Sequence, residues 1–142
     1  MYEFLLKTHS GLRYLVLLML LVVIVNSLIG LTSKKTFGKT DNLLSLVLLI
    51  TTHIQFLAGL VLYFVSPRVV FNDQTMQGDF RYWTIEHSTI MIIAVALITI
   101  ARSTSKKLSD PVAKHRRLFL LNTVALAIIL VAIVMSGRKL FG

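Results

Sequence analysis

The stretch that decides the fold reads LLSLVLLITTHIQFLAGLVLYFV and runs from Leu43 to Val65. These 23 residues carry no formal charge. A helix rises about 1.5 Å per residue, so the segment is long enough to cross a hydrocarbon layer of about 30 Å. His53 lies at its midpoint. Ionisable groups at that depth are costly and usually face a bundle interior, where they mark a pathway or a ligand site.

Three other apolar runs accompany this segment. The first continues backwards from Tyr14–Leu31 along an apolar face, which places His9 and Arg13 inside a helix. The third begins near Arg81, and the fourth follows Asp110-Pro111, a capping residue with proline at the first helical position. The sequence therefore predicts an all-α, four-helix membrane bundle that forms one domain over residues 1–142. We expect its helices at about residues 5–31, 42–66, 81–103 and 111–137.

Local signals predict where these helices begin and end. Asp41 or Asn42 is a suitable cap for the second helix, and Ser66-Pro67 should stop it. A polar segment at residues 68–80 forms the longest loop, and Gly137 before two basic residues predicts the end of the fourth helix.

Composition excludes several function classes. The chain is 56% hydrophobic and has no cysteine, which rules out disulfides, thiolate-bound zinc, iron–sulfur clusters and covalently attached haem. It contains no hydrolytic triad, paired carboxylates, zinc-protease motif or phosphate-binding glycine loop, so we assign no catalytic residue. The net charge of +9 does not indicate nucleic acid, because the basic residues lie in short loops between the spans.

The basic residues predict an orientation. Four spans put both termini on one side, and the two loops on the other side with their flanks hold nine basic residues: Lys34, Lys35, Lys39, Arg102, Lys106, Lys107, Lys114, Arg116 and Arg117. The terminal side holds five, with Arg13 left out because it lies inside a helix: Lys7, Arg68, Arg81, Arg138 and Lys139. Cytoplasmic loops carry the excess of basic residues, so both termini should lie outside, on the periplasmic side of a bacterial inner membrane.

Each helix or its first turns contains one histidine: His9, His53, His87 and His115. Haem held non-covalently in a helical bundle needs imidazoles from facing helices at one depth, so this pattern predicts one or two haem b groups. His9 and His87 enter their helices from the same side at similar depth and form the best iron-ligating pair. His53 and His115 differ by roughly 9 Å in depth, which makes a second pair less well matched.

Three of the histidines also have a plainer interpretation. His9 and His115 lie near helix ends, where an imidazole is simply interfacial. His53 is also placed to hydrogen-bond a Thr or Asn of a neighbouring helix. Polar groups within the spans are expected to form interhelical hydrogen bonds of the same kind: Asn26, Thr51, Thr52, Gln55, Thr99, Asn122 and Thr123.

Arg13 and Glu86 are formal charges inside apolar helices, which are costly unless neutralised. One interpretation is that they pair with each other across the bundle. The functional one is that Arg13 anchors a haem propionate while Glu86 orients an imidazole or relays a proton. The residues leave both open.

Three short motifs carry a family resemblance: HSGLRY at residues 9–14, His53-Ile-Gln55 with Gly59 and Leu62-Tyr63-Phe64, and Glu86-His87. With them the chain resembles small bacterial four-helix membrane proteins labelled cytochrome B and, more loosely, diheme transmembrane cytochromes b. In the diheme group alternate helices supply the ligands. That resemblance implies His9 with His87, and His53 with His115.

The leading hypothesis is a membrane b-type haem protein, an electron carrier rather than a stand-alone enzyme, that works in a bacterial respiratory or redox chain. Its expected partners are the lipid bilayer, a quinol or periplasmic donor, and other membrane redox subunits in an oligomer or larger complex. Two alternatives stay open: a haem-free accessory subunit, and a small proton- or metal-coupled transporter that uses His53 and Glu86 as a relay.

The orientation can be tested by single-cysteine labelling on this cysteine-free background. We expect an impermeant thiol reagent to leave a cysteine at Lys35 or Lys107 unmodified in intact cells, because both loops face the cytoplasm. A cysteine at Gln74, in the outer loop, should be modified and serves as the control. Labelling at Lys35 in intact cells would reverse the orientation but leave the four spans intact.

Overall fold

The computed structural model describes residues 2–67, 69 and 71–135, and these residues form helices joined by short loops. The helical elements follow in the order α1 (Tyr2–Ser33), α2 (Lys39–Val65), α3 (Gly78–Arg81), η1 (Tyr82–Glu86), α4 (His87–Ser105) and α5 (Pro111–Met135). The short α3, the π-helical η1 and α4 follow one another directly. The predicted all-α, four-helix bundle is therefore confirmed.

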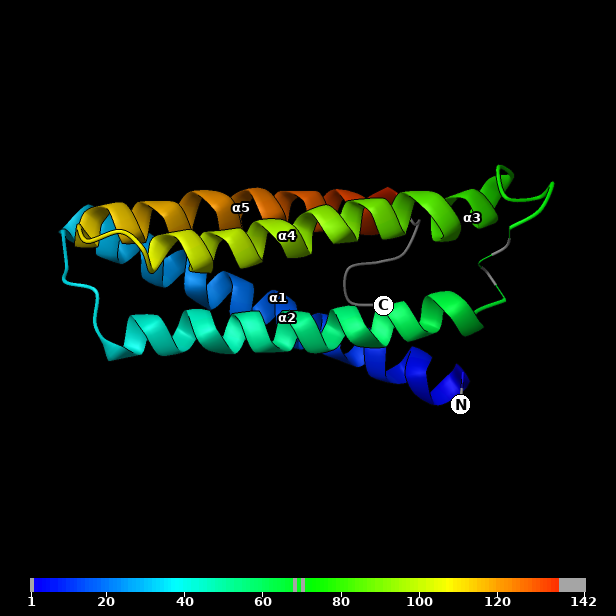
Figure 1. The fold of residues 1–142 in the computed structure, drawn as a ribbon, viewed down its shortest axis with the longest axis horizontal. Helices are drawn as coiled ribbons and strands as arrows, with labels where there is room; N and C mark the ends of the chain where they lie inside the picture. Colours follow the sequence, from blue (N-terminus) through cyan, green and yellow to red (C-terminus); the bar gives the residue numbers. More distant parts are fainter. Residues whose placement is uncertain (1, 68, 70, 136–142) are drawn as a thin grey trace.

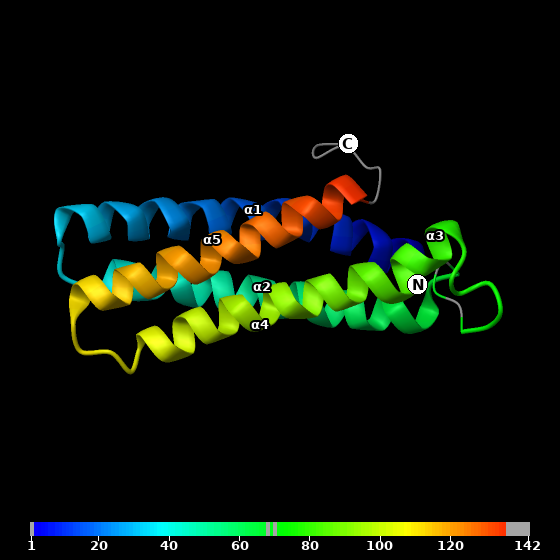
Figure 2. The ribbon, with the colours of Figure 1, turned by 90° about the horizontal axis from the view of Figure 1, so that it is seen from above.

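Each of the four long helices runs antiparallel to the next one along the chain (Figures 1 and 2). α1 packs against α2 and α5, and α4 packs against α5 and, less extensively, against α2. α1 and α4 consequently lie on a diagonal of the bundle. The loops at residues 34–38 and 106–110 lie together at one end, the basic end, and α1 starts and α2 finishes at the opposite end.

The outer surface of the bundle is apolar. The four candidate spans contain 32, 27, 24 and 25 residues and are hydrophobic enough to cross a membrane. Large side chains such as Leu18, Leu57 and Val134 point outwards, whereas Ser27, Asn122 and other polar groups are buried. Because lipid solvates aliphatic side chains and offers no hydrogen bonds, this arrangement suits a bilayer. The chain is a multi-pass membrane protein.

Most helix limits follow the sequence signals. α2 ends at Val65 before Ser66-Pro67, and α5 begins at Pro111, where Ala113 N donates to Asp110 Oδ2 at 3.3 Å. Two details differ from the prediction. α2 begins at Lys39, so Asp41 acts from within its first turn, where it accepts from Gly38 N at 2.8 Å. Helical structure also begins at Gly78, because the short α3 precedes η1. The predicted stop at Gly137 lies outside the described residues.

The core occupies the middle of the bundle. Its fully buried members include Leu20, Leu48, Ala94, Ile98 and Ala125, one or two from each long helix. The buried residues of α4 and α5 include alanines such as Ala94 and Ala125, and small side chains let membrane helices approach closely and gain packing energy without a hydrophobic driving force.

Two of the expected interhelical hydrogen bonds join α1 to α2. Asn26 Nδ2 donates to Asp41 Oδ1 at 2.7 Å, and Gln55 Nε2 donates to the carbonyl of His9 at 2.7 Å. Thr51 was predicted to bond across helices but donates to carbonyls of its own helix, Val47 and Leu48. A threonine hydroxyl can satisfy itself in this way, so its presence in a span does not require a partner helix.

Gly30 sits where α1 crosses α5. Its missing side chain makes room for His115, because a Cβ at Gly30 would fall against all three ring atoms Cε1, Nδ1 and Nε2 of that imidazole. Gly11, in the same helix, has no neighbouring atom within 4 Å of the position its Cβ would take. The imidazole of His115 is therefore a packing element between α1 and α5.

The two glycines give a matched stability test. Alanine is favoured over glycine in a helix by up to about 1 kcal/mol, so Gly11→Ala should leave the free energy of unfolding unchanged or raise it. Gly30→Ala should lower it by about 1–3 kcal/mol, because the new methyl group overpacks the contact with His115. Unfolding in detergent followed by far-UV circular dichroism measures both. Equal effects at the two positions would contradict the packing role of His115.

Candidate functional site

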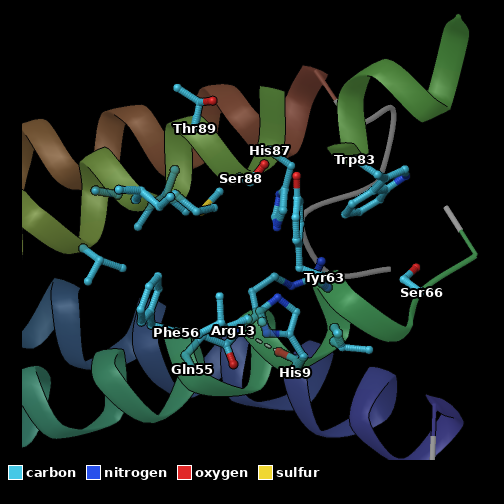
Figure 3. A pocket seen from close by; sticks show the side chains of 18 of the residues that line it. His9, Arg13, Gln55, Phe56, Tyr63, Ser66, Trp83, His87, Ser88 and Thr89 are labelled. Carbon is cyan, nitrogen blue, oxygen red and sulfur yellow. Dashed lines mark hydrogen bonds between the residues drawn. The ribbon is translucent and has the colours of Figure 1, made fainter. Parts of the chain in front are cut away.

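A cavity of about 570 Å³ lies between the helices at the end opposite the basic loops (Figure 3). α1, α2, η1 and α4 supply most of its wall, and Ile129 and Ile133 of α5 close one side. Its lining is largely aliphatic and aromatic, with Phe56, Tyr63, Trp83 and Met91 among the larger side chains. Volumes of 300–1,000 Å³ with such walls and a few polar groups are typical of sites for small molecules and cofactors.

His9 of α1 and His87 of α4 face each other across this cavity (Figure 3). Their ring centroids are 6.3 Å apart, and the ring planes meet at 82°. The structure brings this pair together from diagonal helices, because each imidazole lies a few residues into a helix that starts from the same end of the bundle.

Two contacts from α2 position His9. A Cβ at Gly59 would lie 3.0 Å from His9 Cε1, so the glycine lets the imidazole pack directly on the backbone of α2. One helical turn earlier, Gln55 holds the backbone carbonyl of His9. The missing side chain at Gly59 therefore leaves the space that the His9 imidazole occupies.

His87 follows the π-helical turn η1, in which its backbone N–H bonds to the carbonyl of Tyr82. The rings of Trp83 and Tyr82 lie 5.0 and 5.7 Å from its imidazole. Single π-helical turns inside longer helices occur frequently at functional sites, because the wider turn redirects the side chains that follow. Here the redirected side chain is the imidazole of His87.

Hydroxyl groups tie the π-helical turn to its surroundings. Tyr82 donates to the carbonyl of Ala132 on α5 at 2.6 Å, and Tyr63 of α2 donates to the carbonyl of Thr84 at 3.0 Å. Ser88 also donates to Thr84 O, at 2.8 Å. These bonds attach η1 to two neighbouring helices and so fix the position from which His87 projects.

Arg13 carries the one formal charge among the described residues that line the cavity. Its Nη2 donates to the hydroxyl of Tyr14 at 2.7 Å, and its guanidinium lies 4.7 Å from the centroid of the Tyr14 ring. A positive charge on this largely apolar wall favours a ligand that carries an anionic group.

Glu86 takes a different place from the one expected. It forms an ion pair with Arg81, with 2.8 Å between Arg81 Nε and Glu86 Oε1, and it does not line the cavity. The interpretation in which Arg13 and Glu86 pair with each other, one of the two that the sequence left open, is therefore wrong. Arg81, expected at the start of the third helix, is the last residue of α3, and Glu86 is the last residue of η1, which follows directly.

The structure does not bring His53 and His115 together, and neither lines the cavity. His53 is exposed on the outer seam between α2 and α4, where its Nε2 lies 3.0 Å from Thr99 Oγ1. This is the plainer interpretation offered for it, a hydrogen bond to a neighbouring helix. His115 is buried, with its Nε2 3.3 Å from Thr36 O and its ring 5.3 Å from that of Phe37.

The sequence did not indicate which residues position the imidazoles of His9 and His87. Tyr63 was noted only within a motif. Tyr82 and Trp83 precede His87 by five and four positions. This spacing was a usable signal, since aromatic side chains beside an imidazole restrict its rotation. A π-helical turn has no comparable sequence signature.

The fold and the apolar surface together define a multi-pass, four-helix membrane protein. No protein-family model, no curated protein and no solved structure matches the chain. The resemblance to cytochrome b-like proteins thus stays a prediction. Among the described residues no group of three or more His, Asp or Glu side chains is placed to hold a metal ion.

The hydrogen bond from Tyr82 to Ala132, which attaches the π-helical turn to α5, can be tested with Tyr82→Phe. Loss of one hydrogen bond costs about 1 kcal/mol, so local opening of η1 should become about fivefold more frequent. Hydrogen–deuterium exchange of peptides covering residues 82–90 measures this directly. Tyr2→Phe is the control, because Tyr2 lines the same cavity but its hydroxyl forms no hydrogen bond with the described residues. Unchanged exchange in Tyr82→Phe would show that the bond to Ala132 does not restrain the turn.

Proposed function

We propose that this protein binds one haem b between His9 and His87 and carries electrons within a bacterial membrane. One observation carries the proposal, the separation of the two imidazoles. Two imidazoles that bind one metal ion from opposite sides through bonds of about 2.0 Å place their ring centroids about 6 Å apart. The centroids of His9 and His87 are 6.3 Å apart.

The rest of the cavity is compatible with the same group. Its volume of about 570 Å³ lies in the cofactor range, and Phe56 and Met91 offer apolar walls for a flat macrocycle. Arg13 supplies the cation that a carboxylate substituent would need in this apolar setting. We therefore assign His9 and His87 as the iron ligands and Arg13 as the partner of a propionate.

Bound there, haem would supply a one-electron redox couple. The protein residues do the remaining work. Trp83 and Tyr82 restrict rotation of the His87 imidazole, and Gly59 and Gln55 hold His9 against α2. The positive charge of Arg13 favours the state with one more electron, because Coulomb interactions are strong where water is excluded.

The proposal includes one haem rather than two. His53 and His115 have separate partners, Thr99 for the first and Thr36 with Phe37 for the second. A relay that uses His53 and Glu86 has no structural support either, because neither side chain lines the cavity. A haem-free accessory subunit is the alternative that the first experiment below separates from the proposal.

The stoichiometry of haem is the primary test. We expect protein purified after expression with adequate haem supply to contain about one haem per chain and to give a low-spin, bis-histidine difference spectrum on reduction. Pyridine haemochrome analysis against protein concentration gives the ratio. A colourless protein under these conditions would remove the cytochrome proposal and favour the accessory subunit.

The ligand assignment is tested by single substitutions. His9→Ala or His87→Ala should abolish the low-spin signal, because each leaves iron with one protein ligand. His53→Ala is the matched control, since His53 is exposed on the outer seam and should leave the spectrum unchanged. A full low-spin signal in both His9→Ala and His87→Ala would overturn the assignment, and loss of the signal in His53→Ala alone would move the site.

A further inference from the structure

Arg102 lies buried near the basic end of the bundle, within α4. It flanks a basic loop, but only 7% of its surface is exposed. Its Nη1 donates to Ser45 Oγ at 2.6 Å and to the side chain and backbone carbonyls of Asn42 at 3.0 and 3.3 Å. These bonds hold the guanidinium against the first turns of α2.

No carboxylate neutralises this guanidinium among the residues that the structure describes. Its hydrogen bonds to those residues all leave from Nη1, so Nε and Nη2 have donors to offer. Asp41, the acidic residue of α2, accepts hydrogen bonds from Asn26 Nδ2 and Gly38 N instead. A charge that is buried without a counter-ion is costly, which indicates that an anion completes the site.

Two lysines share a hollow with Arg102. This hollow, about 390 Å³ in volume, is lined by Leu49 of α2, Arg102 and Ser103 of α4, and Lys106 and Lys107 just after α4. It therefore combines three positive charges, one hydroxyl and an aliphatic wall, with no acidic side chain in its lining. Orientation in the membrane and the dipole of α4 account for the exposed lysines, but they do not account for a buried arginine in the same place.

We propose that this hollow binds the phosphate of an anionic phospholipid. The basic end lies where headgroups meet the protein, and basic pockets between membrane helices suit phosphate groups. The planar guanidinium would bind phosphate oxygens through Nε and Nη2, and the two lysines would add charge from the rim. Leu49 and the apolar seam between α2 and α4 would accommodate the first part of an acyl chain.

The test uses the full chain in vesicles. The association constant of spin-labelled phosphatidylglycerol with the protein, divided by that of spin-labelled phosphatidylcholine, should exceed unity. Each lysine near a membrane surface contributes about fivefold to anionic lipid binding, so Lys106→Gln with Lys107→Gln should remove most of the preference. Lys34→Gln with Lys35→Gln is the matched control, because it removes two charges from the other loop of the basic end and should retain most of the preference.

Three results would overturn the proposal. One is a wild-type protein without a preference for phosphatidylglycerol. Another is an equal loss in the two double variants, which would assign the preference to general surface charge. The third is displacement of the labelled lipid by excess inorganic phosphate, which would make the ligand a soluble phosphate instead of a lipid.

Arg102→Lys separates the guanidinium from its charge. The substitution keeps the positive charge but loses the planar arrangement of donors, so we expect a reduced preference for phosphatidylglycerol in protein that remains helical and monodisperse. An unchanged preference would limit the site to the two lysines and overturn the role of Arg102.

Discussion

The absence of water from the bilayer interior is the constraint on which this structure depends. A polar group within a span must find its partner in the protein, because hydrocarbon offers none. Gln55 reaches the backbone of α1, Tyr82 reaches that of α5, and Arg102 reaches the start of α2. Each of these contacts joins two helices, so satisfying buried polar groups and assembling the bundle are the same process here.

The space between the helices is filled differently at the two ends of the bundle. Towards the basic end, small residues and aliphatic side chains fill the space between the helices, and a buried imidazole occupies the notch at Gly30. Towards the other end the π-helical turn η1 precedes α4, and a cavity lies between the two facing imidazoles.

The sequence predicted the spans and the pairing of His9 with His87 for a simple reason. Apolar length and capping residues fix where each helix lies in the membrane, and these two histidines enter at one level from one side. Depth is readable from position along the chain. The structure places both imidazoles on one cavity, whereas their binding of haem stays a proposal.

Lateral contacts were not readable in the same way. The helices are apolar on nearly every side, so the hydrophobic pattern does not fix how each one is rotated about its axis. For this reason the sequence did not reveal that His115 packs on Gly30, or that Arg102 turns inwards to Ser45. The ion pair between Arg81 and Glu86 was not readable from the sequence either.

The facing imidazoles also have a consequence for biogenesis. His9 belongs to the hairpin of α1 and α2, and His87 belongs to the hairpin of α4 and α5, which a nascent chain would insert one after the other. The cavity exists only once the two hairpins have docked. Any ligand that contacts both sides adds its binding energy to that docking step and so stabilises the assembled bundle over the separate hairpins.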